Sequence, residues 1–126
     1  MVDTHTWLWW FSGDSRLSCR AREALDRSAT IGVPAVCCWE TAMLHATERI
    51  ALDRDPLDWL DLALSDEATM LLPLTPAVAV RAVKFGNRLP RDPADRLIVA
   101  TAVEHMAPLV TRDGPITASG LVETIW

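Results

Sequence analysis

Hydrophobic residues along the chain form short extended runs that alternate with longer runs at helical spacing. The apolar positions 39, 42, 43, 46 and 50, for example, repeat at the interval that places side chains on one face of a helix. Ser18, Thr75-Pro76 and Asp92-Pro93 are typical helix starts. The pattern predicts strands at residues 1–2, 29–36, 69–74, 108–113 and 121–126, and helices at residues 4–11, 18–28, 37–50, 56–64, 75–85 and 92–103.

Strands that alternate with helices predict a mostly parallel sheet with helices on both faces. No repeat or long linker interrupts the pattern, so residues 1–126 are expected to form a single domain. In such sheets, functional groups gather just beyond the carboxyl ends of the strands. Asp3 and Asp113 each follow a predicted strand and are expected at that edge.

Composition narrows the classes of protein that fit. Half of the residues are hydrophobic, which argues against disorder. Arg96 and Glu104 interrupt the most hydrophobic region before it reaches the ~18 residues that a membrane span needs. The first residues lack the basic start of a secretory signal, so a soluble cytoplasmic protein is expected. The three cysteines form no Cys-x-x-Cys pair and are expected to be small buried hydrophobes.

Charge is unevenly distributed along the chain. The net charge of −5 should repel nucleic acid unless cations or a local basic patch offset it. Residues 53–67 are strongly acidic, whereas five of the twelve basic residues fall between Arg81 and Arg96. A solvated face is the usual meaning of such a run, but this one leads directly into Asp92 and Asp95.

Each acid near a predicted strand end or helix start has an ordinary structural explanation. Asp92 precedes a proline and is a natural N-cap, which we favour for it. Asp95, and Glu40 in the predicted first turn of its helix, complement the helix dipole. Asp113 suits a turn and Asp3 the end of a strand. However, Asp95 opens a helix that is apolar on nearly every face, so its charge is expected to be partly desolvated and to need a partner.

Taken together, Asp3, Glu40, Asp95 and Asp113 point to one shared site. Strand ends and the starts of the helices that pack on a sheet lie at the same edge, where four carboxylates would repel one another without a cation. Oxygen ligands of this kind suit Mg²⁺ or Mn²⁺. Such ions can activate water and neutralise a phosphodiester during in-line attack.

Five segments resemble PIN-domain proteins in their order along the chain: DTHTWLWW, VPAVCCWETAML, LPLTPAVAVRA, RDPADRLIVATA and LVTRD. The closest resemblance is to VapC-type toxins of bacterial toxin–antitoxin modules. It extends from Asp3 to the final predicted strand. WE before a helix of small residues and DPADRLIVATA are its most specific parts.

The resemblance implies a metal-dependent endoribonuclease on a three-layer α/β/α sandwich with a short, mostly parallel central sheet. Its acidic site corresponds to Asp3, Glu40, Asp95 and Asp113, with Mg²⁺ or Mn²⁺ as the cofactor. Asp3 and Asp95 are the strongest candidates for metal ligands, Glu40 completes the pocket or orients water, and Asp113 is the most dispensable. The resemblance also implies an RNA substrate, a cognate VapB-like antitoxin and a homodimer.

Other residues near the predicted site have open roles. Thr4, His5 and Thr111 are candidates to hydrogen-bond the ligands or the scissile phosphate. Basic side chains could guide RNA phosphates, while one of them, Arg96, could instead pair with an acid. The basic candidates are Arg88, Arg91, Arg96 and Arg112.

Two features depart from the family pattern. Only two apolar residues precede Asp3, where the family usually has several. Cys37 stands where relatives commonly carry a serine, which either weakens a donor to an acid or affects packing alone.

Three tryptophans, Trp7, Trp9 and Trp10, fall on the first predicted helix. Core packing is favoured for one or two of them. The remaining aromatic surface is expected to anchor the antitoxin, in preference to stacking on an RNA base.

Two other functions compete with the nuclease. A phosphoacceptor receiver domain is also doubly wound and binds Mg²⁺, but it needs a lysine at a late strand end, and the only lysine here is Lys84 within a helix. A PIN-like binding protein without catalysis would use the acids only as helix caps. Loss of metal-dependent cleavage in Asp3→Asn and Asp95→Asn would separate the nuclease from the binding protein.

Overall fold

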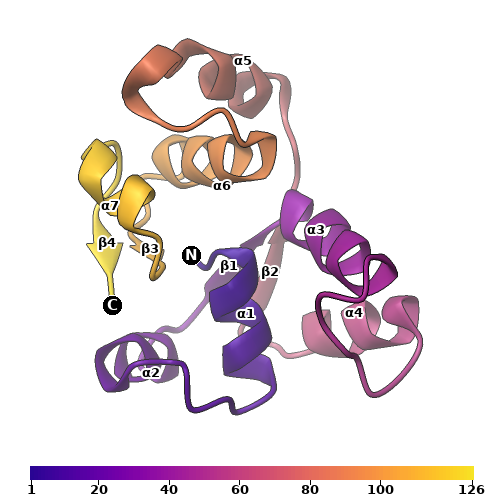
Figure 1. Cartoon of the computed structure of the whole chain (residues 1–126). Helices are drawn as coiled ribbons and strands as arrows, with labels where there is room; N and C mark the ends of the chain where they lie inside the picture. Colours follow the sequence, from indigo (N-terminus) through magenta and orange to yellow (C-terminus); the bar gives the residue numbers. More distant parts are fainter.

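The computed structural model describes all of residues 1–126. Short strands alternate with helices along the chain, as the hydrophobic pattern predicts (Figure 1). The elements follow in this order: α1 (Thr4–Phe11), α2 (Cys19–Asp26), β1 (Ile31–Pro34), α3 (Ala35–Ala46), α4 (Pro56–Leu64), β2 (Thr69–Leu72), α5 (Pro76–Lys84), the 3-10 helix η1 (Gly86–Arg88), α6 (Pro93–Glu104), β3 (Leu109–Val110), α7 (Gly114–Ser119) and β4 (Thr124–Ile125).

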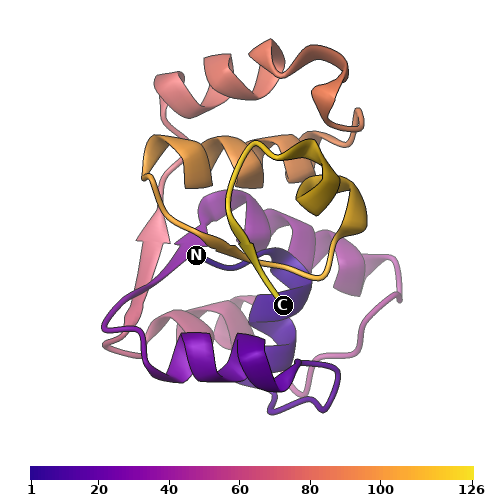
Figure 2. The same cartoon turned by 90° about the vertical axis from the view of Figure 1, so that its left-hand side faces the viewer.

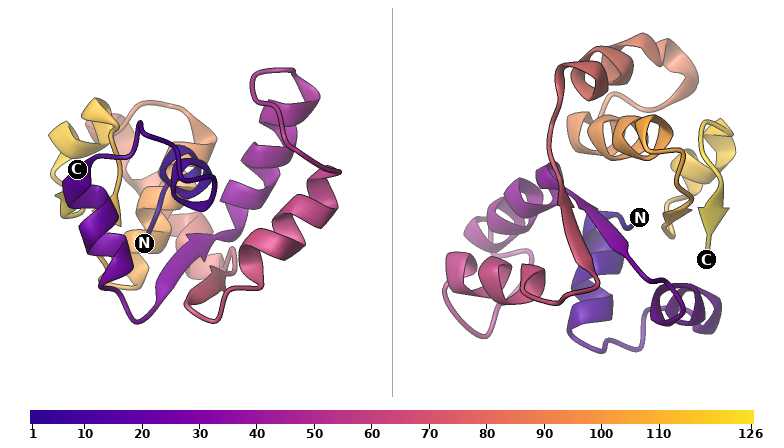
Figure 3. Two further views of the ribbon diagram at one scale, coloured as in Figure 1. Left: turned by 90° about the horizontal axis from the view of Figure 1, so that it is seen from below. Right: turned by 180° about the vertical axis from the view of Figure 1, so that it is seen from behind.

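The strands form two parallel pairs, β1 with β2 and β3 with β4. Val2 joins the two pairs: its amide donates to the carbonyl of Gly32 (3.2 Å), and it forms a parallel bridge with Val110. The order across the centre is therefore β2, β1, Val2, β3, β4. Figure 3 shows β1 and β2 side by side. The predicted mostly parallel sheet is confirmed, with the strand at residues 1–2 reduced to this bridge.

Gly32 allows the N-terminus to lie close against β1. A Cβ atom at this position would meet Cδ1 of Leu72 at 2.7 Å and Cγ of Met1 at 2.9 Å, both too close for ordinary contact. On the other side, the amide of Val110 donates to the carbonyl of Met1 (2.8 Å). Backbone contacts on both sides thus hold the two residues that precede Asp3.

Helices cover both faces of the strands (Figure 2). α5 and α6 lie on one side, and α1, α2 and α4 lie on the other. α3 contacts α1, α4 and α6, so it connects the two helical layers. This arrangement confirms the expected α/β/α architecture.

The core is continuous through α6, as its apolar sequence predicts. Ile98, Val99, Ala100 and Ala102 are at most 1% exposed and belong to one cluster of 24 buried residues. Asp92 caps this helix, since its Oδ1 accepts from the amides of Ala94 (2.9 Å) and Asp95 (3.2 Å). The buried helix therefore begins with two carboxylates at its N-terminus.

Several predicted boundaries were wrong. α3 begins at Ala35, so Glu40 lies in its second turn and does not complement the helix dipole as expected. Residues after Asp113 form α7 where only a turn was predicted, and part of the predicted loop after α5 is η1. The two final predicted strands are shorter than expected, and α2 ends at Asp26.

The exposed aromatic surface is not where the sequence suggested. Trp7 and Trp9 are buried, at 0% and 7% exposure, and Trp10 packs partly against the core. The most exposed indole is instead that of Trp39 on α3, at 60%. None of the helices has both the length and the hydropathy that a bilayer crossing requires.

Candidate active site

Five carboxylates line one cavity of about 570 Å³. They come from separate parts of the chain: the end of the Val2 bridge, α3, the start of α6 and the end of β3. The structure therefore brings together all four acids that the sequence singled out, and it adds the N-cap of α6. The acids that line the cavity are Asp3, Glu40, Asp92, Asp95 and Asp113.

Asp3 is held at both carboxylate oxygens. Its Oδ1 accepts from the amide of Thr6 (2.7 Å), which makes Asp3 the N-cap of α1. Its Oδ2 accepts from the hydroxyl of Thr111, which is fully buried. The side chain is half-buried and fixed in orientation before any ligand binds.

Glu40 is oriented by Thr4, at the start of α1. The Thr4 hydroxyl donates to Oε2 of Glu40 (2.6 Å), and Thr4 itself is only 2% exposed. Behind this pair, the Cys37 thiol hydrogen-bonds with Thr4, and burial raises the pKa of this thiol, so it stays neutral. Cys37 thus touches the group that positions Glu40.

Asp95 is the acid of the cavity whose pKa is raised. Burial raises its pKa to about 7, and the nearby charges of Asp92, Asp113, Glu40 and Asp3 add to the rise. Neither a side chain nor an amide donates a hydrogen bond to its carboxylate, in contrast to Asp3 and Glu40. A carboxylate in this position would be stabilised by a cation.

Asp113 connects the site to α7. Its Oδ1 accepts from the amide of Ile116 (2.7 Å) as the N-cap of that helix. Its own amide donates to Oγ1 of Thr111 (3.0 Å), the residue that also binds Asp3. A single threonine therefore links two of the predicted site acids.

Basic side chains lie on one side of the cavity. Arg16 and Arg112 each place their guanidinium 5.1 Å from the ring centroid of Trp9, a cation–π distance. Arg49 also lines the cavity. His5 is exposed, with its ring 5.7 Å from that of Trp9. Among the basic candidates from the sequence, only Arg112 lines this cavity.

Arg96 does not pair with an acid, which was one of its two predicted roles. Its guanidinium donates to four backbone carbonyls: those of Ala82 (3.2 Å), Leu89 (2.6 Å), Pro90 (2.8 Å) and Gly86. It forms no ion pair with an acid. These contacts connect α5 and residues 86–90 to α6, so the Arg96 side chain stabilises the packing of these segments.

The chemistry of the donor set fits a hard divalent cation. All five acids offer oxygen, and burial, followed by the charges of the neighbouring acids, raises the pKa of Asp95. The acids surround an open cavity and do not form a closed coordination shell, since no three Asp, Glu, His or Cys side chains lie at metal-ligand spacing. Asp3, Glu40, Asp95 and Asp113 are the residues that could hold such an ion.

Sequence reasoning missed Trp9, Arg16 and Arg49 as parts of this cavity. Trp9 was considered for the core, for a partner surface and, less favoured, for stacking on an RNA base. Arg16 and Arg49 lie in segments whose charges suit a solvated surface. No local pattern indicates that these segments meet beside the acids.

The fold and the acidic cavity define a class: the PIN domain family matches residues 1–117, so the chain belongs to the PIN-domain family. The receiver-domain alternative is therefore wrong. More closely, the chain is 40% identical over 113 residues to Ribonuclease VapC22 of Mycobacterium tuberculosis (strain ATCC 25618 / H37Rv), covering 90% of this chain and 85% of that relative. Within the PIN-domain family it is thus of the VapC type.

A solved structure supports the fold independently. The chain is similar to a chain in the crystal structure of VapBC2 from Rickettsia felis bound to a DNA fragment from their promoter. The TM-score is 0.71 at 16% identity, and the match covers 98% of this chain and 95% of that one. At this identity the similarity shows the fold alone.

Proposed function

We propose that residues 1–126 act as a single PIN-like domain that cleaves RNA as a metal-dependent endoribonuclease toxin. The carrying observation is the cavity in which Asp3, Glu40, Asp95 and Asp113 meet, with the pKa of Asp95 raised to about 7. Similarity to a protein named a ribonuclease, at 40% identity, supports RNA as the substrate. A cytoplasmic location, where RNA is available, is part of the proposal.

In this proposal the acids hold Mg²⁺ or Mn²⁺, with Asp3 and Asp95 as the principal ligands. A divalent ion bound there would supply an activated water and neutralise charge on the phosphodiester. Thr111 and Thr4 keep Asp3 and Glu40 in position. Arg112, held over Trp9 at the rim, attracts the RNA phosphate towards a cavity that is otherwise negative.

The decisive experiment compares RNA cleavage by the wild type, Asp3→Asn and Asp95→Asn in the presence of Mg²⁺ or Mn²⁺. We expect each substitution to lower the cleavage rate by more than the roughly 100-fold that loss of an outer ligand partner costs. Asp61→Asn, at an exposed position of α4 away from the cavity, serves as the matched control and should cleave normally. Circular dichroism would establish that all variants are folded.

Retained cleavage in both site variants would refute the nuclease assignment. Absence of metal-dependent cleavage in the wild type would favour the alternative of a PIN-like binding protein whose acids act only as helix caps. Asp3, Asp92 and Asp113 do cap helices. Asp95 and Glu40 cap none, and their presence in the same cavity is what favours the nuclease.

The proposal also includes partners. We propose that a cognate VapB-like antitoxin neutralises the chain and that the chain forms a homodimer. The similar solved structure is of VapBC2, which supports an assembly of this type. Light scattering of the purified chain, alone and after co-expression with the protein encoded next to it, would give both stoichiometries.

A further inference from the structure

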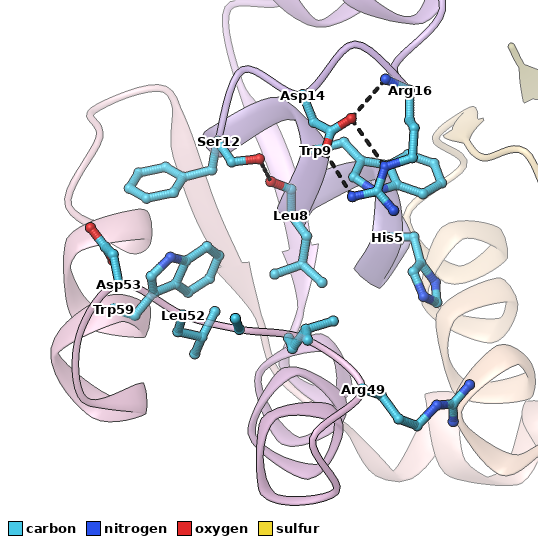
Figure 4. A pocket seen from close by; sticks show the side chains of 13 residues that line it. His5, Leu8, Trp9, Ser12, Asp14, Arg16, Arg49, Leu52, Asp53 and Trp59 are labelled. Carbon is cyan, nitrogen blue, oxygen red and sulfur yellow. Dashed lines mark hydrogen bonds and ion pairs between the residues drawn. The ribbon is translucent and has the colours of Figure 1, made fainter.

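A second cavity of about 730 Å³ adjoins the acidic one (Figure 4). It lies between α1, residues 49–53 and the start of α4. Four side chains line both cavities: His5, Trp9, Arg16 and Arg49. The two cavities therefore meet at a boundary formed by basic and aromatic groups, and a chain-like ligand could occupy both.

Part of the wall of the second cavity is apolar. Leu8, Ile50 and Leu52 line it together with Phe11 and Trp59. Trp59 is only 5% exposed, and its ring meets that of Phe11 edge-on at 5.0 Å. The cavity has the size of a site for a small organic group, with an apolar wall on one part and six polar or charged residues among the thirteen that line it.

The boundary between the cavities is basic. Arg16 is held by Asp14 through two contacts, Nε to Oδ1 at 3.0 Å and Nη2 to Oδ2 at 2.7 Å, which orient its guanidinium over Trp9. Arg49 makes no ion pair and no side-chain hydrogen bond, so its charge is free for a ligand. Figure 4 shows Arg49 and His5 extending towards the same side of the cavity.

Acidic residues of the second cavity do not cancel this charge. Asp14 is already paired with Arg16, and that hydrogen bond lowers the pKa of Asp14 to about 2. Asp53 is paired with Arg54 through contacts of 3.1 and 2.9 Å. The cation left without a partner is that of Arg49, at the boundary with the acidic site.

We propose that the second cavity binds the unpaired base of a nucleotide that flanks the scissile phosphate, while Arg49 binds the intervening backbone phosphate. This inference rests on the proposed endoribonuclease function. The apolar wall suits the face of a base, and the unpaired guanidinium suits a phosphate. A base within a duplex cannot enter, so the site selects RNA that is single-stranded beside the cleaved bond.

A protein segment is the competing occupant, because apolar side chains would also fit these walls. The continuity with the acidic cavity favours RNA. A strand whose phosphate lies at the acids would pass Arg49, the one cation shared by both cavities that is not paired with an acid. The second cavity continues from this shared boundary to the apolar wall.

The test measures RNA binding to a cleavage-deficient Asp95→Asn protein. The probe is a fluorescent single-stranded RNA that contains the mapped cleavage site, and a set of copies carries one abasic nucleotide at successive positions. We expect one abasic position beside the cleaved bond to weaken binding by about 5- to 100-fold, the usual effect of one lost stacking contact. In the same background, Leu52→Ala should reduce this penalty to less than about 2-fold.

The role of the Arg49 charge is tested by the salt dependence of RNA binding. Arg49→Ala should weaken binding of every probe alike and reduce the slope of log affinity against log salt by about 0.7, as expected for one phosphate contact on a single strand. Arg20→Ala on α2 and Leu57→Ala on α4, both exposed and outside the two cavities, are the matched controls. Both should behave as the unsubstituted protein.

Equal abasic penalties in the presence and absence of Leu52→Ala, at every position, would overturn the inference. So would unchanged RNA binding in Leu52→Ala and Arg49→Ala combined with weakened binding of the cognate antitoxin, which would assign the cavity to a protein partner. Failure of the proposed function has a different signature: the wild-type chain with Asp95 intact would then cleave no RNA with Mg²⁺ or Mn²⁺, and the inference would fall with it.

Discussion

Asp95 differs from the other acids of the cavity because it faces burial and like charge without a hydrogen-bond donor. Between its ordinary pKa of 3.8 and its raised value of about 7, the folded protein holds a proton that the unfolded chain releases. Stability of the metal-free protein should therefore decrease as pH rises through this window. The decrease is complete above about pH 8.

Asp95→Asn should remove that pH dependence, because the amide cannot ionise. In EDTA, we expect the free energy of unfolding of the variant relative to the wild type to increase between about pH 4 and pH 8. Denaturant titrations at several pH values would measure it, with Asp61→Asn as a control whose difference from wild type stays constant. A difference for Asp95→Asn that does not change with pH would contradict the assignment. Added Mg²⁺ should make the wild type more stable than Asp95→Asn, since the ion stabilises only the protein that binds it.

Thr111 is the second residue whose contacts predict a measurable effect. Its hydroxyl donates to Asp3 and accepts from the amide of Asp113. Thr111→Val should lower Mg²⁺ affinity by about 10- to 100-fold, because Asp3 loses one of the two donors that orient it. Calorimetric titration would measure the affinity.

Two matched variants make the Thr111 experiment specific. Thr111→Ser keeps the hydroxyl and should restore most of the affinity. Thr101→Val removes a hydroxyl that is equally buried but bonds only to the Leu97 carbonyl within α6, and it should leave the affinity unchanged. If Thr101→Val weakens Mg²⁺ binding as much as Thr111→Val, the effect belongs to general packing.

At the scale of elements, Arg96 joins α6 to α5 and the 86–90 segment through four carbonyls. Arg96→Lys keeps the charge but replaces a planar fork of donors by a single ammonium. We expect it to cost about 2–3 kcal/mol of stability, with RNA affinity unchanged when measured well below the melting temperature. Denaturant unfolding would measure the loss, and Arg91→Lys, at an exposed position, should be neutral. A loss of RNA affinity without a loss of stability would return Arg96 to the RNA-binding group.

Elements with strong local signals could be predicted from the sequence. Asp92 before Pro93, followed by residues that are apolar on every face, defined α6 and its cap. α7 was missed because its six residues begin with Gly-Pro and give too little periodicity to separate a helix from a turn. Glu40 was misplaced because Pro34, at the N-cap of α3, offers no side-chain hydrogen bond that would mark the helix start.

The convergence of acids was predictable because topology alone places strand ends and helix starts at one edge. The contacts that orient those acids were not. The bond from Thr4 to Glu40 spans 36 residues and that from Thr111 to Asp3 spans 108, so both depend on tertiary packing. The meeting of Arg16 and Arg112 over Trp9 depends on the same packing.

At the scale of the whole molecule, the two strand pairs are joined through a very short segment. It consists of Val2, with backbone bonds to β1 on one side and β3 on the other. Gly32 makes the β1 side possible, because a Cβ there would press on Met1 and Leu72. The same join carries Asp3 into the acidic cavity.

Gly32→Ala should therefore disturb both stability and the site. Overpacking at such a position costs about 1–3 kcal/mol, which thermal and denaturant unfolding would detect. We also expect weaker Mg²⁺ binding, because Met1 must move and Asp3 follows it. Gly114→Ala is the control for stability alone, since a Cβ there meets nothing within 4 Å but Gly114 lines the acidic cavity. Equal stability of the two alanine variants, with Mg²⁺ binding of Gly32→Ala unchanged from the wild type, would show that the N-terminus adapts without consequence for the site.

The short join at Met1 and Val2 also implies which part of the protein should open first on heating. Two hydrogen-bonded pairs of strands can each survive while the dipeptide between them detaches, since a terminal segment opens at lower free energy than the buried α6. Detachment removes one carboxylate from the cavity and leaves the rest of the protein folded. Catalytic competence should then disappear, reversibly, several degrees before the heat-absorption peak of global unfolding. Among the amides that are hydrogen-bonded between strands, that of Asp3 should be the first to exchange with deuterium.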